Sequence, residues 1–148
     1  MGNSCGPCTL CCNYPAVPEL KKPINTWCEY CSVGEGCKIY NVRPESCRHY
    51  DCLWLSGCLI PDLRPDLCRV VFERLPSGKT YLALIDPRRQ KTWDKKEVKK
   101  LISMLRDAHR SVVVNTRPAA TVYAARGVTR AEVIADVGAA ARIYGIIR

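Results

Sequence analysis

The 148-residue chain has little of several residue types on which common enzymes and membrane proteins depend. It contains two histidines and one phenylalanine, and no apolar run approaches the roughly 18 residues that a membrane-spanning helix needs. No Ser/His/Asp pattern, close carboxylate pair or glycine-rich phosphate loop is legible. We therefore predict no membrane span and few candidates for a general base, while the question of enzymatic activity stays open.

Cysteine is the abundant residue, with eleven in the chain. Nine of them lie within the first 52 residues, whereas the last 80 residues contain none. The N-terminus lacks the basic start and apolar core of a secretory signal peptide, so we expect a cytoplasmic protein. In that reducing compartment, clustered cysteines are more often metal ligands or redox groups than disulfides.

Charge divides the chain into two unlike halves. Residues 1–66 carry a formal net charge of −1, whereas residues 67–148 carry +10. We expect a cysteine-cluster metal-binding region over 1–66 and a basic α+β region over 67–148, which together could form one compact domain. The basic half permits contact with a protein partner or with nucleic-acid phosphates, although no recognised nucleic-acid-binding motif accompanies its charge.

The basic half begins with a predicted hairpin and a helix. Residues 68–75 and 79–86 are rich in β-prone residues, and Pro76-Ser77-Gly78 between them indicates a turn. From 94 to 109, apolar residues recur at three- and four-residue spacing, which predicts one buried helical stripe with Asp94 as the N-cap.

A second hairpin and a last helix complete this half. We predict strands at 111–115 and 121–126, joined by a turn at Thr116-Arg117-Pro118. Thr129 and Glu132 are the expected capping pair of the last helix. Its expected buried side is formed by Val133, Ile134, Val137, Ala141 and Tyr144. The fold class is therefore α+β: an irregular cysteine-rich half packed on a small ββαββα half.

The cysteine-rich half offers weaker structural signals. Three prolines between residues 6 and 23 predict an irregular arm. Residues 43–57 predict a short helix that begins near Pro44 and carries Cys47 and Cys52. We expect Trp27 and Trp54 to shield a metal site from solvent.

The cysteine spacing predicts a metal centre but does not name the metal. Two CxxC pairs, Cys5/Cys8 and Cys28/Cys31, are separated as in tetrahedral zinc sites. Cys5, Cys8 and Cys11 also form C-x2-C-x2-C, the start of a ferredoxin-like iron–sulfur run, which makes iron–sulfur slightly preferred.

Four cysteine positions carry separate expectations. The neighbours Cys11 and Cys12 would point in opposite directions in an extended chain, so we expect them not to serve one ion. Cys58 and Cys68 lie at looser spacing, and we expect both to be small buried apolar residues.

The sequences CGPCTLCC at 5–12 and CKIYNVRPESCRHYDCLWL at 37–55 resemble those of a known group. The resemblance is to the CxxCxxCC zinc- or iron-chelating family, whose motif is shared with flagellin lysine N-methylases. It implies a metal-chelating cysteine cluster in a small cytosolic bacterial protein. The candidate metal ligands are Cys5, Cys8, Cys11, Cys12, Cys28, Cys31, Cys37, Cys47 and Cys52. We expect Arg43 and Arg48 to hydrogen-bond the thiolates or to hold their loop.

Three functions follow from these features. The leading hypothesis is a protein that binds an iron–sulfur cluster or zinc through its cysteines. The second is a zinc-stabilised nucleic-acid-binding module, and the third is a cluster-dependent enzyme related to methyltransferases.

Overall fold

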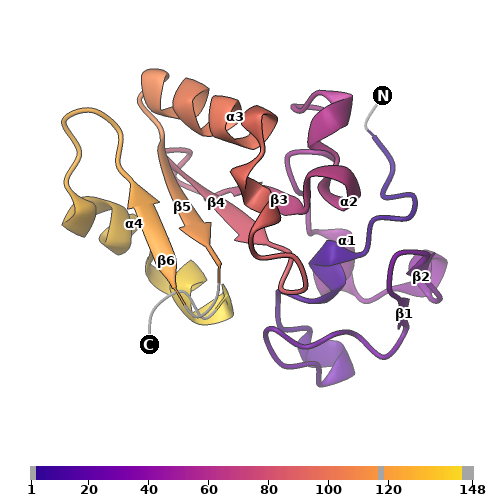
Figure 1. Ribbon diagram of the computed structural model, residues 1–148. Helices are drawn as coiled ribbons and strands as arrows, with labels where there is room; N and C mark the ends of the chain where they lie inside the picture. The colour runs from indigo at the N-terminus through magenta and orange to yellow at the C-terminus, as the bar shows by residue number, and fades with distance from the viewer. Residues whose placement is uncertain (1–2, 117–118, 145–148) are drawn as a thin grey trace.

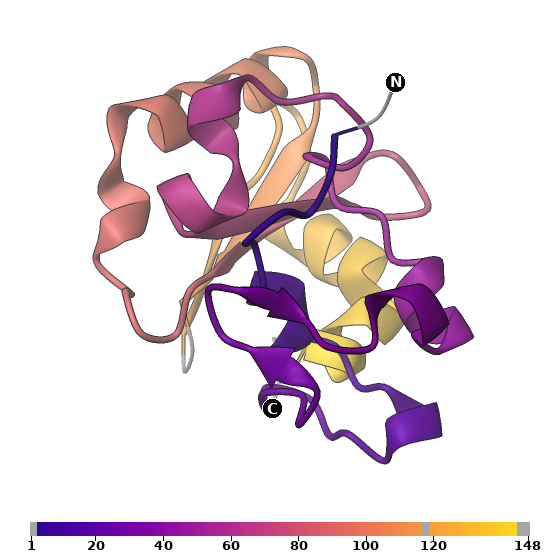
Figure 2. The same ribbon diagram turned by 90° about the vertical axis from the view of Figure 1, so that its right-hand side faces the viewer.

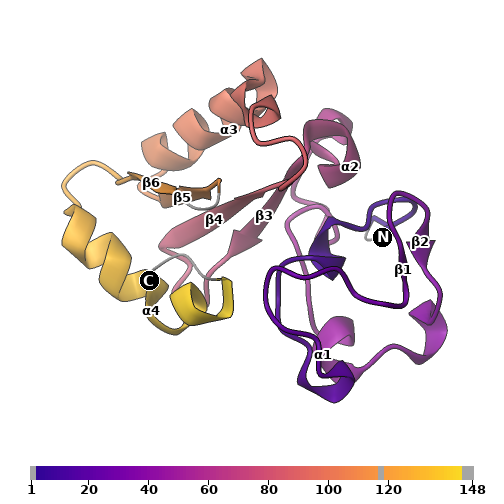
Figure 3. The same cartoon turned by 60° about the horizontal axis from the view of Figure 1, so that its bottom comes forward.

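A computed structural model describes residues 3–116 and 119–144, and its C-terminal part is built on a four-stranded β-sheet (Figure 1). The strands are β3 (Val70–Arg74), β4 (Thr80–Ile85), β5 (Ser111–Asn115) and β6 (Ala120–Tyr123), in the spatial order β3-β4-β5-β6. The helices α3 (Lys96–Asp107) and α4 (Arg130–Tyr144) lie on opposite faces of the sheet (Figure 3). The predicted order ββαββα is confirmed.

Both predicted hairpins are present. The strands β3 and β4 pair antiparallel, as do β5 and β6, whereas β4 and β5 pair parallel with α3 as their connection. A parallel pair needs such a crossover because the chain must return to the same end of the sheet. Arg117 and Pro118 of the predicted turn lie outside the described residues.

Alternate strand residues fill two separate apolar cores. Phe72, Ala83 and Val112 belong to the core beneath α3, whereas Val71 and Leu82 belong to the core beneath α4. This alternation follows from the two-residue side-chain period of a strand. Both faces of the sheet are therefore covered, which explains the nearly continuous apolar runs in the strands.

The start of α3 differs from the prediction. Asp94 ends a short 3-10 turn, η5 (Thr92–Asp94), and forms an ion pair with Lys99. Lys95 occupies the N-cap position, and its side chain makes no capping hydrogen bond. The prediction of Asp94 as N-cap is wrong because the extended backbone at Lys95 moves the helix start by one residue.

The start of α4 agrees with the prediction. The Thr129 hydroxyl accepts a hydrogen bond from the Glu132 N–H, and the Glu132 carboxylate accepts one from the Thr129 N–H. Val133 and Val137 are buried, but Ile134 is 37% exposed, so its predicted burial is wrong. Gly138 has a φ of +34°, which interrupts the helix geometry. The side chains of Ala141 and Tyr144 fall outside the described part of the structure.

The cysteine-rich half consists of short elements joined by turns. The predicted helix over 43–57 is reduced to one turn that carries Cys47 but not Cys52. The N–H of Leu53 donates to the Phe72 carbonyl at 2.9 Å, and this bond to β3 draws the chain out of the helix. The elements are η1 (Leu10–Cys12), η2 (Pro18–Leu20), β1 (Cys31–Ser32), β2 (Gly36–Cys37), η3 (Tyr40–Val42), α1 (Glu45–Arg48), η4 (Pro61–Leu63) and α2 (Pro65–Cys68).

The two halves of the chain share an apolar core. Leu10 and Tyr14 of the N-terminal segment are buried in the same core as Val133 of α4. Figure 2 shows this segment lying close to α4 and the edge of the sheet. The shared core fixes the cysteine-rich half against the sheet.

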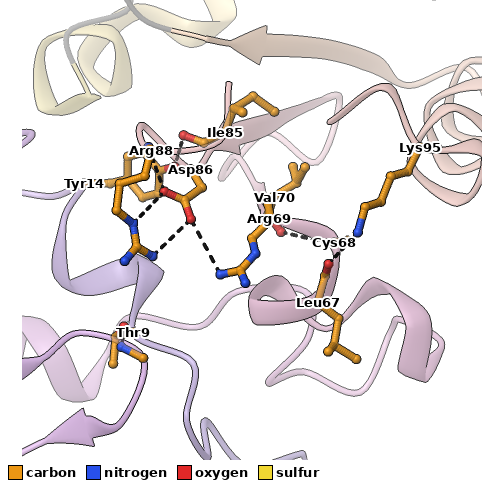
Figure 4. A network of polar contacts seen from close by, with 11 residues as sticks. Thr9, Tyr14, Leu67, Cys68, Arg69, Val70, Ile85, Asp86, Arg88 and Lys95 are labelled. Carbon is orange, nitrogen blue, oxygen red and sulfur yellow. Dashed lines mark hydrogen bonds and ion pairs between the residues drawn. The ribbon is translucent and has the colours of Figure 1, made fainter. Parts of the chain in front are cut away.

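A polar network reinforces this junction (Figure 4). The Tyr14 hydroxyl donates to the Ile85 carbonyl at the end of β4. The next residue, Asp86, is fully buried, and its carboxylate contacts Arg88 at 3.1 Å and Arg69 at 3.7 Å. A buried carboxylate requires such partners because burial removes it from water.

Within residues 3–116 and 119–144, no helix combines the length and the apolar content required to cross a membrane.

Candidate metal centre

The cysteine-rich half contains a pocket of about 100 Å³ that is lined mainly by thiols and apolar side chains. Its cysteines come from the N-terminal segment, from the residues before β1, from β2 of the small hairpin and from α1. The seven cysteines that line it are Cys5, Cys8, Cys11, Cys12, Cys28, Cys37 and Cys47. The fold thus brings most of the predicted ligands together around one space.

Both CxxC pairs adopt the same tight turn. The N–H of Cys8 donates to the Cys5 carbonyl at 2.9 Å, and the N–H of Cys31 donates to the Cys28 carbonyl at 3.0 Å. This hydrogen bond spans three residues, as in a β-turn. The two-residue spacer is what permits such a turn, so spacing and local structure agree.

Further hydrogen bonds join the cysteine segments to one another. The N–H of Cys28 donates to the Cys12 carbonyl at 3.1 Å. The N–H of Gly34, in the turn between β1 and β2, donates to the Thr9 hydroxyl at 2.9 Å. Within the small hairpin, Cys31 is paired with Cys37. These contacts set the N-terminal segment and the hairpin side by side without disulfides, because all eleven cysteines are free.

The neighbouring residues Cys11 and Cys12 both line the pocket. The expectation that they point in opposite directions is wrong because they lie in the 3-10 turn η1 rather than in extended chain. Their thiols are hydrogen-bonded to each other, with Cys11 as the donor.

The remaining cysteines occupy different environments. Cys31 does not line the pocket, but its thiol donates a hydrogen bond to Cys12. Cys52 is buried in the core shared with Leu10. Cys68 is buried as predicted, whereas the predicted burial of Cys58 is wrong because that residue is exposed.

Burial raises the pKa of most of these thiols. It raises the pKa values of Cys8 and Cys31 to about 12, and it also raises those of Cys5, Cys47 and Cys52. Burial raises these pKa values because it removes the thiolate form from water.

Cys12 is the exception among the buried thiols. Hydrogen bonding from Cys11 lowers its pKa to about 7, assisted by Cys31 and by the charges of Lys22 and Arg43. The same hydrogen bond, together with burial, raises the pKa of Cys11 well above the ordinary value. The pair therefore shares one proton between two sulfurs as the pH rises.

Two cations line the pocket together with the thiols. Arg43 lies over the Tyr40 ring, with its guanidinium carbon 4.0 Å from the ring centroid, and both residues hydrogen-bond to Cys5. Lys22 is buried. Arg48 does not reach the pocket; its Nε donates to the Arg43 carbonyl at 2.9 Å and holds the loop.

Sequence reasoning missed Lys22 and the contact of Tyr40 with Cys5. Tyr40 lies in the motif segment at 37–55, but nothing in that segment assigns it a contact, and no cysteine is within five residues of Lys22. Lys22 reaches the pocket because of the folded conformation of residues 13–23, and no pattern in the neighbouring sequence predicts this position.

Apolar side chains form the rest of the wall, including Val17, Leu20 and Ile39. Trp27 and Trp54, the predicted shield, do not line the pocket. Trp54 instead packs on both apolar cores, and its indole N–H donates to the Ser4 carbonyl at 3.0 Å. The shield consists of aliphatic residues because the tryptophans are used at the junction with the sheet.

The donor set fits a soft metal, although the side chains are not yet arranged around an ion. In the part of the chain that the structure describes, no three Cys, His, Asp or Glu groups are placed to hold a metal ion. Cys11 and Cys31 direct their protons at Cys12, so metal binding requires these protons to leave and the sulfurs to turn. Thiolates are the ligands preferred by zinc and iron–sulfur clusters.

Comparison of the chain with protein-family models, curated proteins and solved structures finds no match. The resemblance of the cysteine motifs to the CxxCxxCC family therefore stays a prediction. The assignment of function rests on the pocket and its chemistry.

Proposed function

We propose that this protein binds an iron–sulfur cluster or zinc in the pocket formed by its cysteines. The observation that carries the proposal is the gathering of seven cysteines, together with Arg43 and Lys22, around one pocket. Thiolates bind soft metals, and cations offset the negative charge that several thiolates create.

The number of thiols favours a centre with more than one metal atom. A structural zinc site uses four ligands and is closed around its ion. Seven lining cysteines exceed that number. We therefore place an iron–sulfur cluster first and a pair of zinc ions second.

The chain's own residues would prepare the site by giving up protons. Cys12 loses its proton first because its pKa is about 7, and the more buried thiols follow only as the metal replaces their protons. Arg43 and Tyr40 orient Cys5 by hydrogen bonding. A bound iron–sulfur cluster supplies one-electron transfer, whereas bound zinc supplies rigidity.

Compartment and family follow from the same proposal. Eleven free cysteines fit a reducing environment such as the cytoplasm, because thiols persist there. The CxxCxxCC motif and the segment at 37–55 support membership of the zinc- or iron-chelating family.

Anaerobic purification followed by absorption spectroscopy and analysis of iron, sulfide and zinc tests the proposal. We expect bound iron and sulfide in similar amounts, with a brown colour that Cys47→Ser weakens or removes. Cys58→Ser is the matched control, because Cys58 is exposed and does not line the pocket. Zinc alone at one or two ions per chain would select the second form of the proposal.

Absence of both metals from the wild-type protein, including after reconstitution with iron and sulfide or with zinc, would overturn the proposal. Equal metal content in Cys47→Ser and Cys58→Ser would move the centre out of the pocket.

The charge of +10 on residues 67–148 favours a second candidate, a metal-stabilised nucleic-acid-binding module. Lys96 and Lys100 are exposed on α3, while Arg88, Lys95 and Lys99 make contacts within the chain. Phosphate binding would weaken steeply between low and moderate salt. A lack of retention on DNA and RNA at low salt would remove this candidate.

A further inference from the structure

Lys22 is a buried lysine on the wall of the thiol pocket. The residue is 7% exposed, and it lines the pocket with Cys12 and Arg43. Lysine is rarely buried to this extent unless a specific environment holds its charge. The neighbouring Lys21 is exposed, so of these two lysines only Lys22 is buried.

The backbone fixes Lys22 in place. Val17 and Lys22 form an isolated antiparallel bridge, with N–H to carbonyl distances of 3.0 Å and 3.1 Å in the two directions. Lys21 has a φ of +52°, which turns the chain back after the η2 turn. The loop is thus closed by backbone bonds at its base, directly beside the pocket.

The ammonium group organises the chain around it. Its Nζ donates to the backbone carbonyls of Pro15 at 2.6 Å, Pro23 at 3.1 Å and Asn13 at 3.2 Å. Asn13 directly follows Cys12, so the segment that surrounds the ammonium group is continuous with the segment that carries Cys11 and Cys12.

The three carbonyls accept hydrogen bonds from the ammonium group of Lys22, and this cation lines the same pocket as the thiols. A buried cation is stable only when nearby groups compensate for lost hydration, and an anion does so best. The pocket in front of Lys22 holds the thiols that become anions when a metal binds.

We propose that Lys22 is a positioning residue of the thiol pocket, whose ammonium holds residues 13–23 as a wall and offsets the charge of the metal-binding thiolates. This proposal rests on the proposed metal-binding function. The proposal assigns this role to Lys22 and not to Arg43. Arg43 is half-buried and lies over the exposed Tyr40 ring, whereas Lys22 is bonded to three backbone carbonyls.

Zinc titration of three variants tests the proposal, with Zn²⁺ as the probe because it binds thiolates readily. Lys22→Met removes the charge, Lys22→Arg keeps it, and Lys21→Met is the matched control on an exposed neighbour. Affinity is measured by competition with a chelator from pH 5.5 to 8.5. For Lys22→Met we expect at least a tenfold loss at pH 7 and an upward shift of about one unit in the pH of half-saturation. Lys21→Met should follow the wild type, and Lys22→Arg should recover most of the pH shift.

The outcomes separate this proposal from the function on which it rests. If the wild type binds neither zinc nor iron, the proposed function fails. If the wild type binds zinc and Lys22→Met shows the same pH profile as Lys21→Met, the role of Lys22 is overturned while the metal site stands. Equal pH shifts in Lys22→Met and Lys22→Arg would also overturn the charge role, because geometry alone would explain them.

A measurement on the wild type covers the case in which Lys22→Met does not fold. Amine acylation followed by mass spectrometry gives the labelling of Lys22 relative to Lys21, before and after zinc loading. We expect Lys22 to become more protected on loading, because an ammonium facing thiolates gives up its proton less readily. An unchanged ratio would overturn the proposal.

Discussion

Cys58 and Cys68 show how strongly position decides the chemistry of one residue type. They are separated by ten positions, yet Cys58 is exposed and Cys68 is 1% exposed. The Cys68 thiol donates to the carbonyls of Leu63 at 3.4 Å and Val70 at 3.3 Å. It therefore acts as a small buried group that closes the turn between α2 and β3, outside the metal pocket.

The pH dependence of stability should report on Cys68. Burial raises its pKa to about 11 in the folded protein, against an ordinary value of 9.0. Below pH 9 the thiol is protonated in both states and has no effect on the pH slope. Between pH 9 and 11 the unfolded thiol ionises while the folded one does not, so the free energy of unfolding falls. The full loss is about 2 to 3 kcal/mol.

Denaturant unfolding of the wild type and Cys68→Ala from pH 8 to 11 measures this effect. The variant should lose less stability over that range than the wild type, and Cys58→Ala serves as the control because its thiol is exposed. Parallel slopes for Cys68→Ala and the wild type would show that this thiol does not stay protonated in the folded state.

At the scale of elements, a clasp joins the two walls of the thiol pocket. The Glu19 carboxylate in η2 accepts a hydrogen bond from the Ser46 hydroxyl at 2.8 Å and another from its N–H at 3.1 Å. Leu20 and Cys47, the next residues along the chain, both line the pocket. Hydrogen bonding to Ser46 also contributes to lowering the pKa of Glu19.

Removing the clasp should make the pocket easier to open. In metal-free Glu19→Ala we expect Cys47 to be alkylated severalfold faster than in the wild type, because the two walls are no longer joined. Site-resolved mass spectrometry after a short pulse of iodoacetamide measures the rate. Glu35→Ala, in the turn of the small hairpin, is the matched control. An unchanged rate at Cys47 would show that the clasp does not limit access to the pocket.

The elements that the sequence predicts well are those set by local rules. Runs of β-prone residues bounded by turn residues located β3, β4, β5 and β6, and the Thr129–Glu132 pair located the start of α4. The helix over 43–57 was predicted too long because a single long-range bond, from Leu53 to Phe72, ends it early. The parallel pairing of β4 with β5 could not be predicted, because local sequence patterns do not show which strands become neighbours in the sheet.

Of the candidate site, the sequence predicted the tight turns of its cysteines. Both CxxC pairs form such a turn because it is a local structure, and Cys5, Cys8 and Cys28 of these pairs line the pocket. The cation Lys22 and the contact of Tyr40 with Cys5 depend on loops that meet only after folding. The expectation that Cys11 and Cys12 point in opposite directions was wrong because it assumed an extended segment, whereas these residues form a 3-10 turn.

At the scale of the whole molecule, the thiol pocket and the sheet share structural supports. Leu10 and Tyr14, on either side of the Cys11–Cys12 pair, are buried against the sheet and α4. Arg88 contacts the buried Asp86 carboxylate and also lies 5.0 Å from the centroid of the Trp27 ring, beside Cys28. A change in the conformation of the pocket should therefore also alter the packing at the end of β4.

Removal of the metal should lower the stability of the entire chain. At a free metal concentration a thousand times the Kd, binding stabilises the folded state by about 4 kcal/mol. For a protein of this size that corresponds to a fall in Tm of roughly 10 °C when a chelator removes the metal. Calorimetry of loaded and chelator-treated protein measures this fall in Tm, and Cys58→Ser is expected to show the same difference as the wild type.

Hydrogen exchange after metal removal should accelerate first at residues 5–16 and then in β3 and β4, because Tyr14 joins these parts. Faster exchange confined to residues 5–52, with an unchanged Tm, would mean that the two halves fold independently and that the shared core does not couple them.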